Sequence, residues 1–375
     1  MSDLILVINT GSSSIKFQVF NTRPVLKCLL KGKIVDLGLS PSFIAMDSAN
    51  QAQTLALPAH CNHEEALHFL FRWLQDENQG MPINTVTHRI VHGGDRYTSS
   101  VVVTPEVMAY LRQLCPLAPL HQPHNLMAVD IFSAFKPELV QIACFDTAFH
   151  AGHNPLLTAY ALPQNLRDQG IRRYGFHGLS YEWLAHSLHQ NEPALAKKRL
   201  VAAHLGNGAS LCAMNNGCSV DTTMGMTALD GLPMGTRCGS LDPGAVIYMT
   251  RELQLSPDEA ESILYHESGL RGLSQWTQDV RLLQNSRDPK AQFALDFFCL
   301  RAAQFAGMMA VSLGGIDGLV FTGGIGENAR PVRESIVHYL DFLRPFEVRV
   351  IEANEEHMMA LHTLAVLEHH KEEPT

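Results

Sequence analysis

One pattern, a strand followed by a turn of small polar residues and then a second strand, occurs twice in this sequence. The first copy spans 4–20 with its turn at 10–14, and the second spans 200–214 with its turn at 206–210. Apolar and polar residues alternate with a period of two after the first turn, which is typical of a half-buried strand. We therefore predict that the chain contains one structural unit twice, in two halves divided near residue 150.

Helix and strand signals between these copies indicate an α/β fold. Apolar strand-like runs at 141–145 and 318–321 each end in polar or glycine-rich residues, and 323–328 predicts a third glycine-rich turn. Ser256 to Glu259 reads as a capping box, and Asp288 with Pro289 opens a long helix that Gly314 can close. Strands that alternate with capped helices predict α/β layers with functional loops at the strand ends.

Composition and charge exclude several classes of partner and place the chain in the cytoplasm. The 375 residues carry a net charge of -9 without a dense basic run, so we expect no nucleic-acid and no membrane partner. The apolar stretch 293–313 contains Asp296, Arg301 and Gln304, which favours a buried helix over a membrane span. The eight scattered cysteines and the absence of a signal-peptide pattern fit a reducing cytoplasm.

The turn at 10–14 is a candidate phosphate site, because Ser12 and Lys16 can supply donors next to closely approaching backbone N–H groups. The alternative is an ordinary hairpin turn. The second turn at 206–210 favours the phosphate interpretation, since two such turns in duplicate lobes would face one cleft. The turn at 323–328 matches neither a Walker loop nor a Rossmann fingerprint.

Seven motifs resemble, in order, those of the acetate kinase family. They lie at 8–16, 88–94, 145–150, 173–178, 204–208, 234–237 and 323–328. That family belongs to a superfamily with sugar kinases, Hsp70 and actin, whose duplicated ribonuclease-H-like lobes hold ATP in a cleft. The resemblance implies an actin-like ATPase fold, for which we expect an N-terminal lobe of 1–149 plus 357–375 and a nucleotide-binding C-terminal lobe of 150–356.

The resemblance implies that Arg89 and Arg237 lie at the transferring phosphoryl group, with His177 as a further stabiliser. Planar guanidinium groups suit this task, because a carboxylate and ATP repel each other until cations offset their charge. A surface ion pair is the ordinary alternative for each arginine. Asp146 stands where the family has an acidic catalytic residue. Since a carboxylic acid is already ionised near neutral pH, we expect Asp146 to orient Arg89 or metal-bound water instead of removing a proton.

The family's metal-linked positions match Asn9 and Glu355, and the metal is expected to be Mg²⁺, with Mn²⁺ as an alternative. The alternative for Glu355 is a solvated carboxylate at a helix start. Arg89 with the apolar residues Val91, Leu120, Phe176 and Ala228 matches the family's acyl-binding positions. Ala228 stands where proline is common, which leaves room for propionate as well as acetate; ordinary core packing is the rival interpretation of the apolar residues.

The nucleotide-binding positions implied by the resemblance lie in four segments. They are Ser12 and Lys16; His204, Leu205, Gly206, Asn207 and Gly208; Asp279, Val280 and Arg281; and Gly324, Ile325, Gly326, Glu327 and Asn328.

The resemblance implies a reversible kinase that forms an acyl phosphate from ATP and a short-chain carboxylate. We expect ATP or ADP as co-substrate, a homodimer and direct in-line transfer. A sugar or polyol kinase of the same superfamily and a non-catalytic nucleotide-binding protein are the alternatives. Turnover that depends on a carboxylate separates the first interpretation from both of these.

Overall fold

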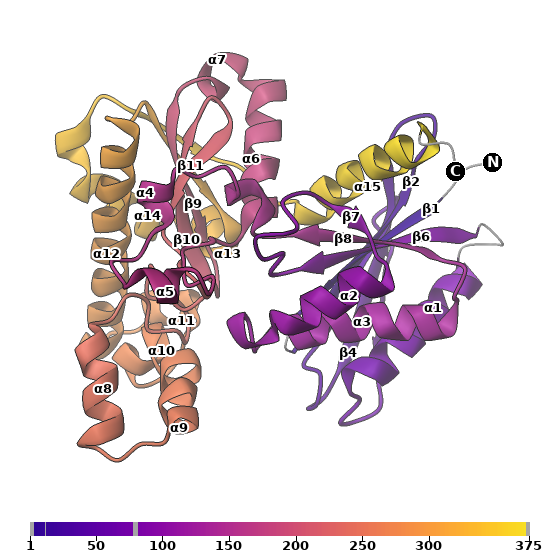
Figure 1. Ribbon diagram of the computed structural model, residues 1–375, viewed down its shortest axis with the longest axis horizontal. Coiled ribbons are helices and arrows are strands. Elements are labelled where there is room, and N and C mark those ends of the chain that lie inside the picture. Colours follow the sequence, from indigo (N-terminus) through magenta and orange to yellow (C-terminus); the bar gives the residue numbers. More distant parts are fainter. Residues whose placement is uncertain (1–3, 12, 78–81, 373–375) are drawn as a thin grey trace. The chain divides into compact units, whose positions relative to one another are not determined.

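The structure is a computed structural model (Figure 1) that describes residues 4–11, 13–77 and 82–372. The chain divides into two compact units, residues 1–148 with 354–375 and residues 149–353. Each unit is built on one mixed sheet that carries helices.

The first unit contains an eight-stranded sheet in the order β5-β4-β3-β2-β1-β6-β8-β7. The strands are β1 (Leu4–Thr10), β2 (Ile15–Asn21), β3 (Lys27–Val35), β4 (Ser42–Asp47), β5 (Ala52–Ala56), β6 (Ile83–Ile90), β7 (Val101–Val102) and β8 (Val140–Phe145). β1 to β5 form an antiparallel meander, whereas β6 runs parallel to β1, and β8 runs parallel to β6. The carboxyl ends of β1, β6 and β8 therefore lie at the same edge.

Helices cover both faces of this sheet. They are α1 (His63–Glu77), α2 (Pro105–Gln113), α3 (Gln122–Phe135) and α15 (Glu355–Glu372). Within this unit, Figure 1 shows α15 on the face opposite to α1 and α3, and α15 contacts β1, β2, β6 and β8. The core between α1 and the sheet contains Phe17, Phe43 and Trp73. The centroids of their rings lie 4.7 to 6.2 Å apart. Burial of these large apolar rings fixes the helix on the sheet.

The second unit contains a five-stranded sheet in the order β11-β10-β9-β12-β13. The strands are β9 (Arg199–Leu205), β10 (Ala209–Asn215), β11 (Cys218–Thr222), β12 (Gly318–Thr322) and β13 (Glu347–Val350). β9, β10 and β11 are antiparallel neighbours, β12 is parallel to β9, and β13 is parallel to β12. This is the pairing of β3-β2-β1-β6-β8 in the first unit, so the predicted duplication and the predicted α/β class are confirmed.

The helices of the second unit include several short ones. They are α4 (Pro155–Thr158), α5 (Gln164–Arg167), α6 (Gly178–Asn191), α7 (Pro193–Ala196), α8 (Pro243–Arg251), α9 (Pro257–Ser262), α10 (Gly269–Ser274), α11 (Val280–Gln284), α12 (Pro289–Leu313), α13 (Gly323–Asn328) and α14 (Arg330–Tyr339), with a π-helical turn at Ile263–Glu267. The predicted capping box at α9 is present. The segment 323–328, predicted as a turn, is the short helix α13, whose first residue has a φ of +78°.

The longest helix, α12, begins and ends where the sequence predicts. Asp288 caps its first turn, Pro289 follows, and Gly314 ends it with a φ of 69°. α12 is long and apolar enough to cross a membrane by length and composition, yet half of its most apolar window is buried inside the structure. It packs on β9, β10 and β11 and against α10, α11 and α14. These contacts support the prediction of a buried core helix.

Candidate active site

Strand register brings Arg89 and Asp146 together in the first unit. Arg89 lies near the end of β6 opposite Cys144 of β8, and the Asp146 amide donates to the Ile90 carbonyl just beyond the ladder. Arg89 Nε lies 2.8 Å from Asp146 Oδ1, and Arg89 Nη2 lies 2.6 Å from Oδ2. Both carboxylate oxygens therefore accept from one guanidinium, which is the strong bidentate geometry.

The start of α15 brings a second carboxylate to the same arginine. Arg89 Nη1 lies 2.8 Å from Glu355 Oε2. Asn9 Nδ2 lies 3.4 Å from Glu355 Oε2 and 3.5 Å from Glu356 Oε1. Glu355 begins α15 and is 9% exposed, so it is a helix-start carboxylate that is buried and not solvated.

Burial disfavours the charged form of Arg89, but attraction to Asp146, Glu355 and Glu356 outweighs that cost and raises the guanidinium pKa above its ordinary value. The side chain is 16% exposed, and it is charged at any physiological pH. Arg89 is therefore a fixed cation that Asp146 and Glu355 orient.

The oxygen groups beside Arg89 suit a hard divalent cation. Carboxylates such as Glu355 and the amide oxygen of Asn9 are ligands that Mg²⁺ prefers, usually one or two from the protein with water and phosphate completing the octahedron. No group of three or more His, Cys, Asp or Glu arranged to hold a metal occurs among the described residues. A sparse oxygen set therefore fits Mg²⁺ bound together with a phosphate ligand.

The first glycine turn, between β1 and β2, is held by hydrogen bonds to its backbone. The Gly11 amide donates to the Ser14 carbonyl at 2.8 Å, and Asn125 Nδ2 donates to the Thr10 carbonyl at 2.7 Å. Lys16 is exposed on β2, paired in register with Asn9. Ser12 lies outside the described residues.

The second glycine turn, between β9 and β10, lies beside two other predicted residues of the same unit. A Cβ placed on Gly208 would lie 3.1 Å from His177 Nε2 and 3.8 Å from Arg237 Nη1. The Gly206 amide donates to the Gly208 carbonyl at 2.9 Å, and the Gly235 amide donates to the Asn207 carbonyl at 3.1 Å. The structure thus gathers the turn, His177 and Arg237, which are distant in sequence.

His177 precedes α6 in a left-handed backbone conformation, with a φ of 58°. Its ring stacks on the ring of His204 with centroids 4.3 Å apart. His177 Nδ1 lies 2.9 Å from Ser210 Oγ, and Ser180 Oγ lies 2.8 Å from His204 Nδ1. These contacts hold both rings beside the second turn.

Arg237 is anchored through backbone and π-helix contacts. Its Nη1 donates to the Ala228 carbonyl at 3.1 Å. Burial lowers its pKa from the ordinary value, while Tyr265 of the π-helical turn partly offsets that effect. The guanidinium stays protonated at physiological pH even so. Thr236 Oγ1 donates to the Tyr265 carbonyl at 2.8 Å, which ties the same turn to the loop that carries Arg237.

In the segment of α13, two of the predicted nucleotide residues have structural hydrogen bonds. Glu327 Oε1 accepts from the Gly323 and Ala353 amides, each at 2.9 Å. Asn328 Nδ2 donates to the Gly324 carbonyl at 2.9 Å. A Cβ on Gly206 would lie 3.9 Å from the Gly324 amide nitrogen. The glycine start of α13 therefore lies beside the second turn.

Asp279, Val280 and Arg281 form the start of α11. Asp279 caps the helix by accepting from the Arg281 amide, and the Arg281 guanidinium lies 2.7 Å from Asp279 Oδ2. Val280 is buried, whereas the Arg281 side chain is 84% exposed. These hydrogen bonds lie within the segment itself, so its nucleotide role stays a prediction.

The predicted acyl-lining residues divide between the two units. Val91 is buried and Leu120 is half-buried in the first unit, where the Val91 amide donates to Asn125 Oδ1 at 3.1 Å. Phe176 and Ala228 are 1% and 9% exposed in the second unit. Phe176 adjoins His177 in the chain, and the Ala228 carbonyl accepts from Arg237. In the second unit, Ala228 therefore lies next to Arg237, and Phe176 lies next to His177.

Sequence reasoning did not assign Glu356 or Tyr265. Glu356 directly follows a predicted metal residue, so its position at a helix start was a usable signal. Tyr265 carries no such signal, because only the fold places the π-helical turn next to the Arg237 loop.

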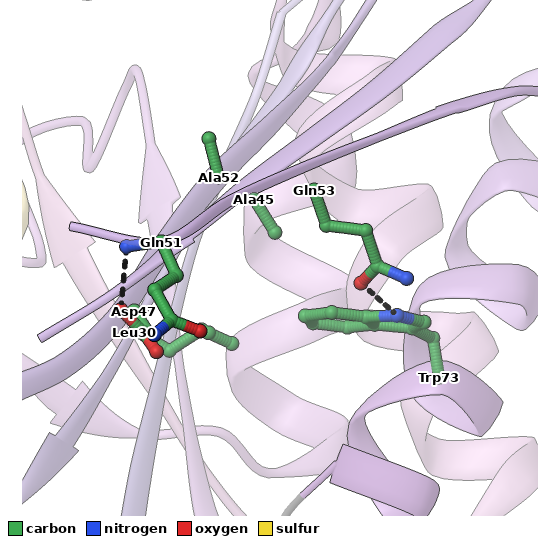
Figure 2. Close-up of a pocket in the computed structure, with 7 residues that line it drawn as sticks. All are labelled: Leu30, Ala45, Asp47, Gln51, Ala52, Gln53 and Trp73. Carbon is green, nitrogen blue, oxygen red and sulfur yellow. Dashed lines mark hydrogen bonds between the residues drawn. The ribbon is translucent and has the colours of Figure 1, made fainter. Parts of the chain in front are cut away.

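A pocket at the outer strands of the first unit contains none of the predicted residues. Figure 2 shows it between β3, β4, β5 and α1, where Trp73 Nε1 donates to Gln53 Oε1 at 3.2 Å and the Gln51 amide donates to Asp47 Oδ1 at 2.9 Å. Among the described residues that line it, Asp47 alone is ionisable, so the pocket gives no support for phosphoryl chemistry.

Comparison with known proteins gives a consistent family assignment. The model of the acetokinase family matches residues 4–361. The chain is 48% identical over 341 residues to an acetate kinase of Rhodopseudomonas palustris (strain TIE-1), covering 90% of this chain and 86% of that protein. It is 43% identical over 390 residues to an acetate kinase of Nitrobacter hamburgensis, covering 97% and 96%.

Solved structures agree. A propionate kinase from Francisella tularensis has a TM-score of 0.90 at 32% identity, covering 96% of this chain and 98% of that chain. The acetate kinase of Porphyromonas gingivalis has a TM-score of 0.85 at 32% identity, covering 97% and 100%. These matches favour a carboxyl acceptor over the sugar-kinase alternative. With the family model spanning nearly its whole length, the chain belongs to the acetokinase family and is a phosphotransferase with a carboxyl group as acceptor.

Proposed function

We propose that this protein transfers the γ-phosphoryl group of ATP reversibly to acetate, with propionate as a second acceptor, through the residue roles given below. Membership of the acetokinase family supports ATP-dependent phosphorylation of a carboxylate. The observation that carries the residue roles is that Arg89 is fixed by Asp146 and Glu355, while Arg237 and His177 flank a glycine turn.

Charge compensation is the main task of the protein in this reaction. The attacking carboxylate and the phosphates of ATP are all anionic, and phosphoryl transfer needs in-line positioning and offset of negative charge more than covalent chemistry. Arg89 and Arg237 supply permanent positive charge, and His177 supplies a ring nitrogen as a further donor. Direct transfer then needs no phosphorylated enzyme.

Asp146 orients Arg89 in this proposal. Both of its oxygens already accept from the guanidinium, at 2.8 and 2.6 Å. The acceptor carboxylate carries no proton to remove near neutral pH, since its pKa is about 4 to 5. A general base therefore has no substrate proton to take, and the value of Asp146 lies in fixing the guanidinium plane.

Glu355 and Asn9 would hold Mg²⁺, with Mn²⁺ as an alternative. The bound metal supplies charge neutralisation on the phosphates of ATP. Glu355 also accepts from Arg89, so the same carboxylate keeps the arginine and the metal position in one fixed arrangement. Glu356 adds negative charge next to Asn9 and favours a cation there.

The phosphates of the nucleotide would contact the backbone of the two glycine turns, together with Ser12 and Lys16. The segment from His204 to Gly208 lies beside His177 and Arg237, which supports contact with phosphates. The starts of α11 and α13, 279–281 and 324–328, are assigned to the adenosine end.

We propose that Arg89, Val91 and Leu120 of the first unit and Phe176 and Ala228 of the second unit bind the acceptor acid. We expect Ala228→Pro to fill space and to lower the propionate to acetate ratio of kcat/KM, since one methylene in an apolar pocket changes that ratio by about tenfold. The ratio is measured from initial rates with each acid. An unchanged ratio would remove Ala228 from the residues that bind the acid.

A homodimer in the cytoplasm completes the proposal. The region of α8 exposes Leu241, Ile247 and Tyr248 by 45 to 57%, which supports a contact with another copy of the chain. Light scattering on the purified protein measures the mass in solution. A mass equal to the 41.4 kDa chain at micromolar concentration would contradict the dimer.

The deciding experiment is a substrate panel with the purified full chain. ADP release and acyl phosphate, trapped as a hydroxamate, are measured with ATP, Mg²⁺ and acetate, propionate, butyrate or glycerol. We expect both products with acetate and propionate and neither with glycerol. ADP release that depends on glycerol would overturn the proposed function. So would a rate of ATP hydrolysis that is the same with and without a carboxylic acid.

A further inference from the structure

A hydrogen-bonded series of side chains connects β11 to the segment that carries His177. Ser219 Oγ lies 2.6 Å from His153 Nε2 and 2.7 Å from His150 Nδ1. His150 Nε2 lies 3.0 Å from the Phe176 carbonyl oxygen. His150 and His153 are 1% and 8% exposed, and neither has a part in the proposed function above.

The Phe176 carbonyl, at the end of the series, determines which group donates and which accepts in each hydrogen bond. A carbonyl oxygen only accepts, so His150 Nε2 carries a hydrogen and donates to Phe176. In a neutral ring Nδ1 is then the acceptor, so Ser219 donates to it. Because Ser219 has a single hydrogen, His153 Nε2 must donate to Ser219 Oγ, and the Cys212 thiol, at 3.2 Å, can donate to the remaining lone pair.

The neutral state of both rings is favoured by their surroundings. Burial, together with the neighbouring His153, lowers the pKa of His150 to about 3. Burial lowers the pKa of His153 to about 4; Asp221 opposes this shift, and Arg172 and Arg173 add to it. Tyr181 packs edge-on against His150, and Cys212 faces Ser219.

The backbone before His177 packs directly on this series. Gly175 has a φ of +82°, and a Cβ there would lie 2.8 Å from His150 Cδ2. Movement of the His150 ring therefore moves the chain at 175 and the Phe176 carbonyl, and His177 follows in a left-handed conformation.

We propose that His153, Ser219 and His150 are positioning residues, which fix the Phe176 carbonyl and thereby the ring of His177. The inference rests on the proposed function in one respect, since His177 is there assigned to the transferring phosphoryl group. For neutral rings, the two tautomers follow from the hydrogen-bond geometry, and they can be measured whether or not the protein turns over a carboxylate.

Ring-nitrogen NMR on the full chain labelled with ¹⁵N-histidine tests the series directly. We expect His150 and His153 to be neutral, with hydrogen on Nε2, throughout pH 6 to 8. Assignment uses His150→Gln and His153→Gln. A charged ring in that range, or hydrogen on Nδ1 of His150, would overturn the series of donors and acceptors.

Kinetics with Ser219 variants test the positioning role. Ser219→Ala is expected to lower kcat about tenfold and to raise KM for the carboxylate, leaving KM for ATP unchanged, because both hydrogen bonds between Ser219 and the two histidines are lost. Ser219→Thr keeps the hydroxyl on a strand position and is expected to restore most of the rate. Thr363→Val, which removes a buried hydroxyl pair with Thr87 in the first unit, serves as the control with unchanged kinetics.

A second pair of variants keeps the test decisive if Ser219→Ala folds poorly. The amide nitrogen of glutamine, like His Nε2, is three bonds from Cβ, whereas that of asparagine is two bonds away. His150→Gln is therefore expected to retain the bond to Phe176 and more activity than His150→Asn. Equal rates for this pair, or wild-type kinetics for Ser219→Ala, would overturn the positioning role. Loss of carboxylate turnover in the unmodified protein would instead refute the proposed function, and the tautomers would still be measurable.

Discussion

Arg89 and Arg237 differ in how their charge is held. Three carboxylates surround Arg89 and raise its pKa, so its guanidinium is locked by charge. Arg237 Nη1 donates to a neutral carbonyl, and burial lowers the pKa of this side chain. Two carboxylates bonded to one guanidinium resist rotation of its plane, so Arg89 is suited to keep a fixed geometry. Burial leaves the charge of Arg237 weakly screened by water, so Arg237 is suited to act on a nearby anion.

We predict that Arg89→Ala and Arg237→Ala each lower kcat by about 10²- to 10³-fold, the scale for removal of one group that stabilises transition-state charge. Initial rates of ADP release with saturating acetate measure the effect. Arg112→Ala is the matched control, because Arg112 forms an exposed ion pair with Asp130 away from the candidate site. Rates within a factor of two of the unmodified protein for either site variant would refute that arginine's role.

Asp146→Asn separates orientation from proton removal. The amide oxygen can still accept from Arg89 Nε, but the amide nitrogen cannot accept from Nη2, so one of two hydrogen bonds is lost. We expect kcat to fall about tenfold, which is less than for Arg89→Ala. Activity as low as in Arg89→Ala would instead indicate that Asp146 takes part in proton transfer.

At the scale of elements, the functional residues lie where strands end and helices begin. Asn9, Arg89 and Asp146 lie at or near the carboxyl ends of β1, β6 and β8, and Glu355 begins α15. In the second unit, the turn after β9 and the start of α13 after β12 repeat this arrangement. Parallel pairing places such ends at one edge, which is why ligand sites of open α/β sheets occur there.

Gly323, which begins α13, tests how closely this helix start packs on β9, and Gly307 in the middle of α12 serves for comparison. Gly323 has a φ of +78°, and a Cβ on it would lie 2.8 Å from the Leu205 carbonyl oxygen, whereas a Cβ on Gly307 of α12 would meet no described atom within 4 Å. We predict that Gly323→Ala destabilises the protein by more than about 1 kcal/mol and that Gly307→Ala stabilises it by about 0.5 to 1 kcal/mol. Urea unfolding followed by circular dichroism measures both. A stabilising Gly323→Ala would contradict the close approach of α13 to β9.

At the scale of the whole molecule, buried neutral histidines make stability depend on pH. Burial lowers the pKa of His88 to about 4, partly opposed by its hydrogen bond with Gln141, and His150 and His153 have pKa values of about 3 and about 4. In the unfolded chain a histidine has a pKa of about 6.5. Between these values the unfolded chain binds more protons, so stability is fully present above about pH 6.5 and falls as pH decreases toward 4.

We predict that the free energy of unfolding falls by about 1.4 kcal/mol per pH unit for each such histidine in that window. His88 belongs to the first unit, and His150 and His153 belong to the second. If the units unfold separately, the second unit has the steeper slope. Urea titrations at pH 4.5 to 8 measure the slope of the free energy of unfolding against pH. His88→Gln is expected to lower this slope by the contribution of one histidine. A flat profile from pH 6.5 to 4.5 would show that these rings are charged in the folded protein.

The predictable part of this protein was local. The two strand–turn–strand copies, the capping box at α9 and the limits of α12 follow from periodicity, capping chemistry and glycine, which act over a few neighbouring residues. The candidate residues came from motifs of the same short range. The glycines of 323–328 predict a turn because their helix propensity is low, and this prediction is wrong because packing of α13 on β9 overrides that propensity.

Sequence alone determined that the chain is a duplicated α/β protein with glycine turns and arginines in ordered motifs. Tertiary structure decided which partners those groups have. Arg89 meets Asp146 through the register of β6 and β8, and meets Glu355 because α15 returns to the first unit from the far end of the chain. The bonds from His153 to Phe176 likewise join segments that no local pattern relates. Such contacts depend on three-dimensional packing, in which sequence separation has no fixed relation to distance.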